Sequence, residues 1–183
     1  MNIINLAESL LLPEENSEMQ KFIQMLEASD YSAFYNDNQS IIQNILFIES
    51  LAEFLDFAEE NKLVAECYCA AFLCAKGYGI QVGGYEDDLT FALTSFFENK
   101  GFMYPEVSEI ICREKIYTDC SDYDNFKKAL TEINQVLSAY GMRLIVFEDF
   151  VYCDCQYTIL MVEKAFADKI MPLWESENFE IYL

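Results

Sequence analysis

The 183-residue chain contains no histidine. Histidine is the commonest general base and a principal zinc ligand, so its absence excludes the Ser-His and Cys-His arrangements of nucleophilic catalysis. No motif in the sequence assigns a catalytic residue or a cofactor. The sequence therefore favours a non-catalytic protein over an enzyme.

Basic residues are also scarce, with 11 lysines and arginines against 32 acidic residues and a net charge of −21. Nucleic-acid affinity depends on basic side chains that neutralise phosphates, and anionic membrane surfaces attract basic segments. We therefore expect neither nucleic acid nor a membrane as a partner. Two interpretations of the charge stay open, namely solubility alone and the attraction of a basic protein.

Long apolar runs and a secretion signal are missing as well. The longest apolar run, Cys67 to Ala75, is too short to span a bilayer. Residues 1–12 have no positively charged start and include Glu8, so we expect no signal peptide. The seven cysteines are Cys67, Cys69, Cys74, Cys112, Cys120, Cys153 and Cys155. Their odd number and apolar surroundings predict free thiols in a cytoplasmic protein.

Apolar residues, in contrast, make up 53% of the chain and aromatic residues 15%, which indicates a substantial core. There is no linker and no low-complexity tract, so residues 1–183 are expected to form a single compact domain. The predicted class is α+β. Residues 1–61 form a helical part, and residues 62–183 form an α+β part with a small, mostly antiparallel sheet backed by helices.

Periodicity and capping residues place the expected elements. In the first part they predict a helix from Glu14 to Ala28, a polar loop from Asp30 to Gln39, and a second helix after Ser40 that continues to Leu55. Further helices are expected at 62–76, 86–99, 122–140 and 163–171, and strands at 78–82, 143–148, 156–162 and 179–183. Residues 102–119 are left open, with 110–117 either a strand or irregular.

Two segments together resemble a known family. The first is Ala75-Lys76-Gly77-Tyr78-Gly79-Ile80-Gln81-Val82, followed by Glu86-Asp87-Asp88 and Ala92-Leu93. The second runs from Tyr140 to Asp149, followed by Asp154, Tyr157 and the strand Ile159-Leu160-Met161-Val162. Over residues 60–172 this layout resembles an uncharacterised bacterial family, domain of unknown function 6630. Gly83-Gly84 stands where that family tends to have Asp-Trp. The resemblance implies an architecture and a bacterial source, but no activity.

Three carboxylates, Glu148, Asp149 and Asp154, lie between two predicted strands. Oxygen donors that converge in a turn bind Ca²⁺ or Mg²⁺, so these residues are metal candidates, although their spacing is not that of a Ca²⁺ loop. A solvated acidic loop is the alternative. The Cys67-x-Cys69 pair points in two directions on a helix, about 200° apart, and does not make a zinc site.

The candidates for partner binding lie in the first part of the chain, where residues 1–61 carry twelve acidic residues and one basic residue. Tyr31, Phe34 and Tyr35 are expected to be exposed in the polar loop, near acids of the following helix. Exposed aromatics beside charged residues are typical of protein-binding patches. The full set of candidates is Tyr31, Phe34, Tyr35, Glu53, Asp56, Glu59 and Glu60.

The favoured hypothesis is therefore a non-catalytic, acidic protein-interaction module, of which an immunity-like or antitoxin-like protein that binds a basic partner is one version. A small metal-dependent hydrolase that uses the clustered carboxylates is an alternative. A structural or regulatory domain that associates through an exposed sheet edge is another. The sequence does not predict the oligomeric state.

Overall fold

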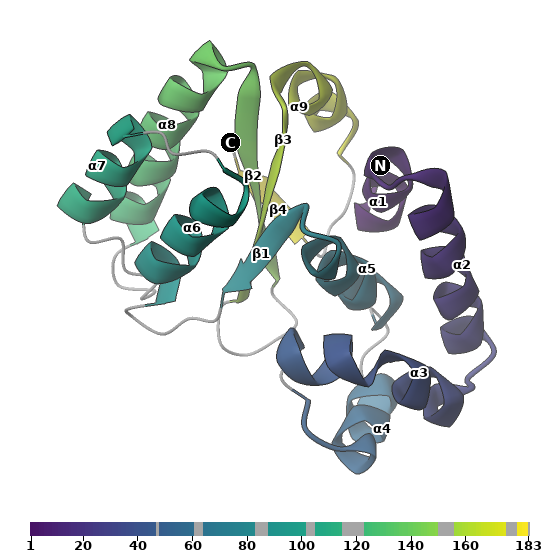
Figure 1. Ribbon diagram of the computed structural model, residues 1–183. Helices are drawn as coiled ribbons and strands as arrows, with labels where there is room; N and C mark the ends of the chain where they lie inside the picture. The colour runs from purple at the N-terminus through teal and green to yellow at the C-terminus, as the bar shows by residue number, and fades with distance from the viewer. Residues whose placement is uncertain are drawn as a thin grey trace. The chain divides into compact units, whose positions relative to one another are not determined.

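The computed structural model describes residues 1–46, 48–60, 64–82, 88–101, 105–114, 123–149, 156–174 and 179–182 (Figure 1). The chain divides into two compact units, Met1–Gly77 and Tyr78–Leu183. The first is helical and the second contains the sheet, so the predicted α+β class is confirmed. The prediction of a single compact domain remains a prediction.

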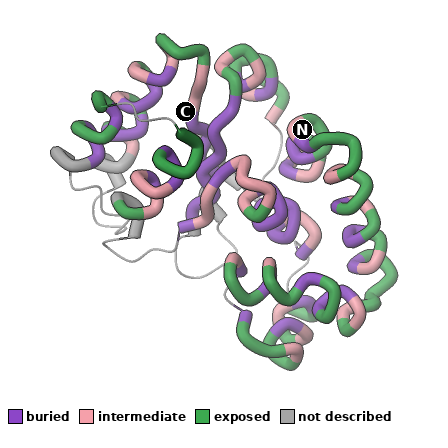
Figure 2. The backbone as a smooth tube through the Cα atoms, viewed as in Figure 1, coloured by how far each residue is buried: buried purple, intermediate pink, exposed green. Residues whose placement is uncertain are grey.

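The first unit consists of the helices α1 (Ile3–Leu10), α2 (Pro13–Glu27), α3 (Tyr31–Asn44), α4 (Leu51–Glu60) and α5 (Val64–Ala75). α5 is apolar on most sides and contacts α1, α2 and α3, which is where such a helix is most stable. Figure 2 shows that most residues along α5 are buried. Because α5 packs within this unit, the helical part extends to Gly77, whereas the sequence placed its end at residue 61.

The ends of α2 confirm the helix expected from Glu14 to Ala28. Pro13 occupies the first turn, where its missing N–H costs no hydrogen bond. At the other end Ser29 adopts a left-handed conformation with φ of 57°. The N–H of Asp30 donates to the carbonyl of Met25 at 2.9 Å, which closes the helix in the usual left-handed motif.

The predicted polar loop at 30–39 is wrong, because Tyr31–Asn44 forms the single helix α3, kinked at Asn38. Its inward residues Phe34, Asn38 and Ile42 are spaced by four, and the polar residues between them face solvent. The polar residues of this segment therefore form the exposed face of a helix and not a loop. The expected second helix is also divided, and α4 begins after Ser50, whose Oγ accepts the N–H of Glu53 at 3.2 Å.

An aromatic cluster fills the core of the first unit. The rings of Phe34 and Phe54 stack with centroids 5.5 Å apart, and Tyr68 meets Phe34 edge-on at 4.9 Å. The Tyr68 hydroxyl donates to Asn38 Oδ1 at 2.9 Å, and the Asn38 amide donates to the carbonyl of Phe34. The cluster therefore joins α3, α4 and α5 and satisfies the buried Asn38 amide within it.

The second unit contains the strands β1 (Gly79–Val82), β2 (Met142–Asp149), β3 (Gln156–Glu163) and β4 (Phe179–Tyr182). They form an antiparallel sheet in the order β1-β3-β2-β4, with Ile145 opposite Leu160 in the central pair. The predicted antiparallel sheet is confirmed. The first strand does not pair with the next one in sequence, so β3 reaches the middle of the sheet only through the tertiary fold.

The helices α6 (Asp88–Asn99), α7 (Pro105–Glu114) and α8 (Tyr123–Ala139) share a core with one face of the sheet. Residues Leu93, Ile133, Leu144 and Val146 belong to this core. The expectation that 110–117 is a strand or irregular is wrong up to Glu114, because α7 is helical there, with Val107, Ile110 and Ile111 buried at helical spacing. α9 (Lys164–Ile170) and the 3-10 turn Met171–Leu173 follow β3.

We predict that Gly79→Ala destabilises the protein by about 3 kcal/mol. A Cβ at this position overlaps the carbonyl oxygen of Ile159 on the neighbouring strand, and backbone cannot move aside as a flexible side chain can. Gly101→Ala is the control, since a Cβ there meets nothing within 4 Å and only its φ of 69° opposes alanine, at about 1 kcal/mol. Urea unfolding of both variants measures the difference, and equal losses contradict the close strand approach.

Candidate partner-binding surface

Helix α4 presents acidic side chains on its exposed side. Its residues Phe54 and Ala58 are buried against the core. With 3.6 residues per turn, the opposite side of the helix carries the remaining charged positions. All four predicted acidic candidates lie exposed on this helix, namely Glu53, Asp56, Glu59 and Glu60.

Glu53 also has a structural role at the start of α4. Its Oε2 accepts the backbone N–H of Glu49 at 2.9 Å, and its own N–H donates to Ser50 Oγ. A carboxylate in the first turn also interacts favourably with the positive end of the helix dipole. The contribution of Glu53 to the stability of α4 therefore explains its presence without a partner.

Glu59 and Glu60 lie at positions where a negative charge destabilises the helix. They end α4, whose last turn contains no basic residue. A negative charge there meets the negative end of the helix dipole, which costs about 0.3–1 kcal/mol per residue. Asp56 lies four residues before Glu60, a spacing at which like charges repel. Folding alone does not favour this arrangement.

The four acids form no ion pair with any residue in the described part of the chain. Among the ion pairs within the first unit are Lys21 with Asp37 at 3.7 Å and Lys76 with Glu18 at 2.6 Å. Both are remote in sequence from α4. Within the described part of the chain, no lysine or arginine neutralises the carboxylates of Asp56, Glu59 and Glu60.

The aromatic candidates divide into two groups. Tyr31 is half-buried at the start of α3, with its ring edge-on to Phe54 at 6.4 Å. The expectation that Phe34 and Tyr35 are exposed is wrong, because both lie on the inward side of α3 and are 0% and 4% exposed. The Tyr35 hydroxyl instead donates to the carbonyl of Glu49, which ties α3 to the segment before α4.

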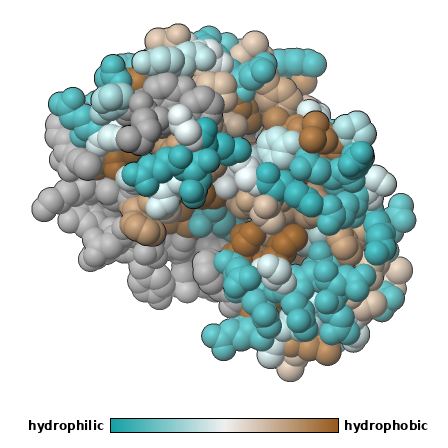
Figure 3. Space-filling view, in the orientation of Figure 1, coloured by the Kyte–Doolittle hydropathy of each residue, from teal (hydrophilic) through white to brown (hydrophobic). Residues whose placement is uncertain are grey.

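We call Tyr31, Glu53, Asp56, Glu59 and Glu60 the α4 surface. Phe57, which sequence reasoning missed, borders these acids on the same helix and is half-buried, with its ring 6.3 Å from Phe54. Its position between Glu53 and Glu60 on the same expected helix could have identified it from the sequence. In the view of Figure 3, hydrophilic residues gather over α3 and α4, with smaller hydrophobic areas among them.

The predicted metal site remains a prediction. Glu148 and Asp149 are the last two residues of β2, opposite Tyr157 and Gln156 of β3. Asp154 lies outside the described residues. Among the residues that the structure does describe, no group of three or more Cys, Asp or Glu side chains is arranged to hold a metal ion.

The cysteines of α5 form no disulfide, as predicted, with Cys67 and Cys69 buried and Cys74 half-buried. Burial raises the pKa of Cys69, and the nearby charge of Glu66 raises it further. Burial raises the pKa of Cys74 to about 12. At neutral pH both thiols stay protonated, so they are poor nucleophiles and poor metal ligands. Cys120, Cys153, Cys155 and the side chain of Cys112 lie outside the described residues.

No protein-family model matches the chain, and no curated protein or solved structure does so either. The resemblance to domain of unknown function 6630 therefore stays a prediction. Within the described residues, no helix is both long and apolar enough to cross a bilayer. β1 and β4 are the outer strands of the described sheet, and the hypothesis of association through a sheet edge remains untested.

We predict that native protein resists alkylation at the three α5 cysteines, because Cys67 and Cys69 are buried and burial raises the pKa of Cys69 and of Cys74. All three lie in the tryptic peptide of residues 63–76. Iodoacetamide treatment at mildly alkaline pH, followed by mass spectrometry, is expected to leave this peptide unmodified in the native protein. The same peptide from urea-unfolded protein is the control and is expected to react fully. Rapid native labelling of Cys69 contradicts its placement in the core.

Proposed function

We propose that this chain is a non-catalytic, acidic protein-interaction module of the cytoplasm that binds a basic protein through the α4 surface. An immunity-like or antitoxin-like protein, which neutralises a cationic toxin, is the specific form of this proposal. The partner supplies lysine or arginine side chains to Asp56, Glu59 and Glu60. Tyr31 and Phe57 supply apolar contact at the border of the acids.

The observation that carries the proposal is the position of Glu59 and Glu60. Carboxylates at the end of a helix reduce its stability, so their presence favours a role outside the fold. A cationic partner removes this repulsion when it binds. The energetic disadvantage in the free protein thus becomes a contribution to affinity in the complex.

The charge of the whole first unit supports the same partner class. Residues 1–77 carry thirteen acidic and three basic residues, a net charge of −10. A field of one sign over a binding surface accelerates encounter with an oppositely charged protein, and the effect decreases as salt rises. The proposal therefore implies association that is fast at low ionic strength.

The α4 surface is also suited to binding without rearrangement. Phe54, stacked on Phe34 and fully buried, fixes α4 on the rest of the unit. A surface that is already rigid loses little conformational entropy on binding. Aromatic side chains such as Tyr31 commonly contribute a large share of the energy in protein interfaces.

We predict that Glu60→Lys increases stability and weakens partner binding. Replacing an acid in the last turn of α4 with a base suits the helix dipole, so the free energy of unfolding is expected to rise by about 0.3–1 kcal/mol. Binding is expected to weaken about tenfold or more, because charge pairs in protein interfaces often contribute more than 1.4 kcal/mol. Urea unfolding and isothermal titration with a basic partner recovered at low salt provide the two measurements.

Glu27→Lys is the matched control. Glu27 is an exposed acid in the last turn of α2, in the same unit, and that turn also lacks a basic residue. Its replacement changes the net charge equally and is expected to stabilise the protein equally, while affinity changes much less. The proposal is rejected if no basic partner is recovered at low salt. It is also rejected if Glu27→Lys weakens binding as much as Glu60→Lys.

A further inference from the structure

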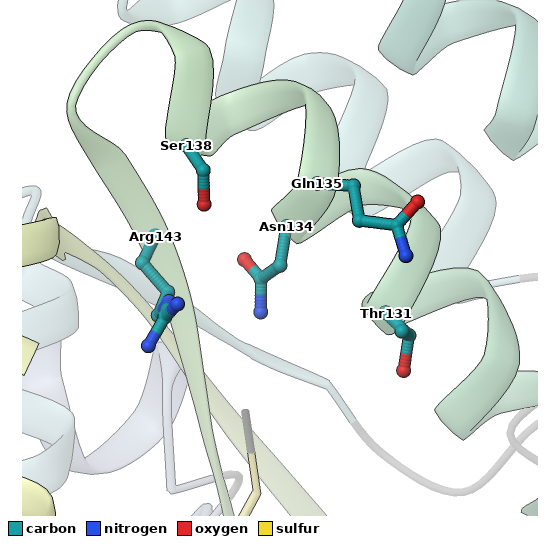
Figure 4. A pocket seen from close by; sticks show the side chains of 5 residues that line it. All are labelled: Thr131, Asn134, Gln135, Ser138 and Arg143. Carbon is teal, nitrogen blue, oxygen red and sulfur yellow. The ribbon is translucent and has the colours of Figure 1, made fainter. Parts of the chain in front are cut away.

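Two asparagines are buried within the described part of the chain, Asn38 in the first unit and Asn134 in the second. Asn134 projects from α8 and lines a hollow of about 180 Å³ beside β2 (Figure 4). Both of its hydrogen bonds go to the backbone of Leu144, so they serve the contact of α8 with β2. Asn38 differs, because it lies at the kink of α3 and links that backbone to the Tyr68 side chain of α5.

The side chain of Asn38 accounts for the kink in α3. Asn38 has a φ of −123° and a ψ of 18°, which are not helical values. Its Nδ2 donates to the carbonyl of Phe34 at 2.9 Å. In a regular helix that carbonyl accepts the backbone N–H of the residue four positions later, which here is Asn38 itself. A side chain that inserts into this ladder of hydrogen bonds bends the helix at that point.

Tyr68 determines how the Asn38 amide is oriented. The Tyr68 hydroxyl donates to Oδ1 of Asn38 at 2.9 Å, which leaves Nδ2 for the carbonyl of Phe34. Both side chains are buried, so a lost bond is not replaced by bulk water. Burial also raises the pKa of Tyr68, so its hydroxyl keeps its proton and stays a donor at neutral pH.

Two other side chains of α3, one on each side of the kink, converge on a single carbonyl. Tyr35 precedes the kink, and its hydroxyl donates to the carbonyl of Glu49 at 3.2 Å. Gln43 follows the kink, and its Nε2 lies 3.1 Å from the same carbonyl and 3.1 Å from the Tyr35 hydroxyl. Residues eight apart are separated by about 12 Å along a regular helix. The angle between the two halves of α3 therefore decides whether both side chains reach Glu49.

Glu49 connects the kinked helix to α4. Its carbonyl is held by α3, and its backbone N–H donates to Oε2 of Glu53 in the first turn of α4, at 2.9 Å. Asp56 and Glu60 follow Glu53 on the same helix at spacings of three and four residues. A displacement of Glu49 therefore moves the start of the helix that carries the acids.

We propose that Tyr68 is a positioning residue for the α4 surface. It orients Asn38, Asn38 fixes the kink of α3, and the kinked helix holds Glu49 and thereby the start of α4. The hydrogen bonds run from α5 through α3 to α4, so a change at Tyr68 alters a surface that another helix presents. The effect of Tyr68 on binding rests on the proposed function, whereas its effect on the order of α4 does not.

Tyr68→Phe tests the first link of this chain of hydrogen bonds. The variant loses the hydroxyl and keeps the ring that packs edge-on against Phe34. Amide hydrogen exchange in α4 is expected to become about tenfold faster, while exchange in α1 changes less than about twofold, because only α4 is attached through Glu49. Equal acceleration in α1 and α4, or no acceleration in either, overturns the proposal.

Ile23→Val is the matched control for Tyr68→Phe. Ile23 is buried in the same unit and takes no part in these hydrogen bonds, and the loss of one buried carbon costs about as much stability as the loss of one hydrogen bond. Its effect on exchange in α4 is expected to be no larger than its effect in α1. Selective acceleration of α4 in Ile23→Val overturns the proposal, because general destabilisation then explains the result.

Gln43→Ala tests the last link, at Glu49. Gln43 is an exposed residue, so this variant keeps the test decisive if Tyr68→Phe does not fold. Gln39→Ala is its control, at another exposed position of α3. Exchange in α4 is expected to become about threefold faster in Gln43→Ala and to stay unchanged in Gln39→Ala. Equal effects of the two replacements overturn the proposal.

Octalysine is the probe for the consequence in binding. It is titrated into the full chain at low salt, and the NMR shifts of the α4 amides report its binding. Its affinity is expected to be about threefold lower for Tyr68→Phe and unchanged for Ile23→Val, because a less ordered surface loses more conformational entropy on binding. Equal affinity of Tyr68→Phe and the unaltered protein overturns the proposal. If octalysine shifts no α4 amide of the unaltered protein, that result contradicts the proposed function, and the exchange measurements still decide the role of Tyr68.

Discussion

The first unit depends on the packing of Phe34, Phe54 and Tyr68. These three rings come from α3, α4 and α5, and each is fully buried. Complete burial of a large apolar side chain contributes about 1.5–3 kcal/mol. The hydrogen bond from Tyr68 to Asn38 is formed inside the same cluster, so the one polar group at the kink of α3 is also satisfied. Phe54 therefore attaches α4 to the rest of the unit, together with the buried Ala58 and the hydrogen bond from Tyr35 to Glu49.

The stability from this packing exceeds the cost of the acidic residues on α4. Each carboxylate at the end of α4 opposes helix stability by tenths of a kcal/mol to about 1 kcal/mol, whereas the aromatic residues beneath contribute several kcal/mol together. The fold therefore tolerates Glu59 and Glu60 where helix energetics disfavour them.

In the second unit the short strand β4 leaves part of the sheet edge uncovered. β4 covers only half of the β2 edge, and the uncovered half lies beside α8. Asn134 substitutes for strand pairing at Leu144 and thereby limits further addition of a strand at this edge. On β2 next to Leu144, Arg143 forms an ion pair with Asp168 of α9 at 2.8 Å, which ties the start of β2 to that helix.

Sequence alone determined the α+β class, the antiparallel sheet, the ends of α2 and α8, and the burial of cysteines in α5, because local periodicity, capping and apolar context carry this information. It also located the acids of α4. Only the tertiary structure decided that Phe34 and Tyr35 are core residues, since a polar exposed helix face and a loop have the same composition. The pairing of β1 with β3 and the ion pair of Arg143 with Asp168 likewise bring together residues far apart in the chain, and no local pattern encodes which distant segments will meet.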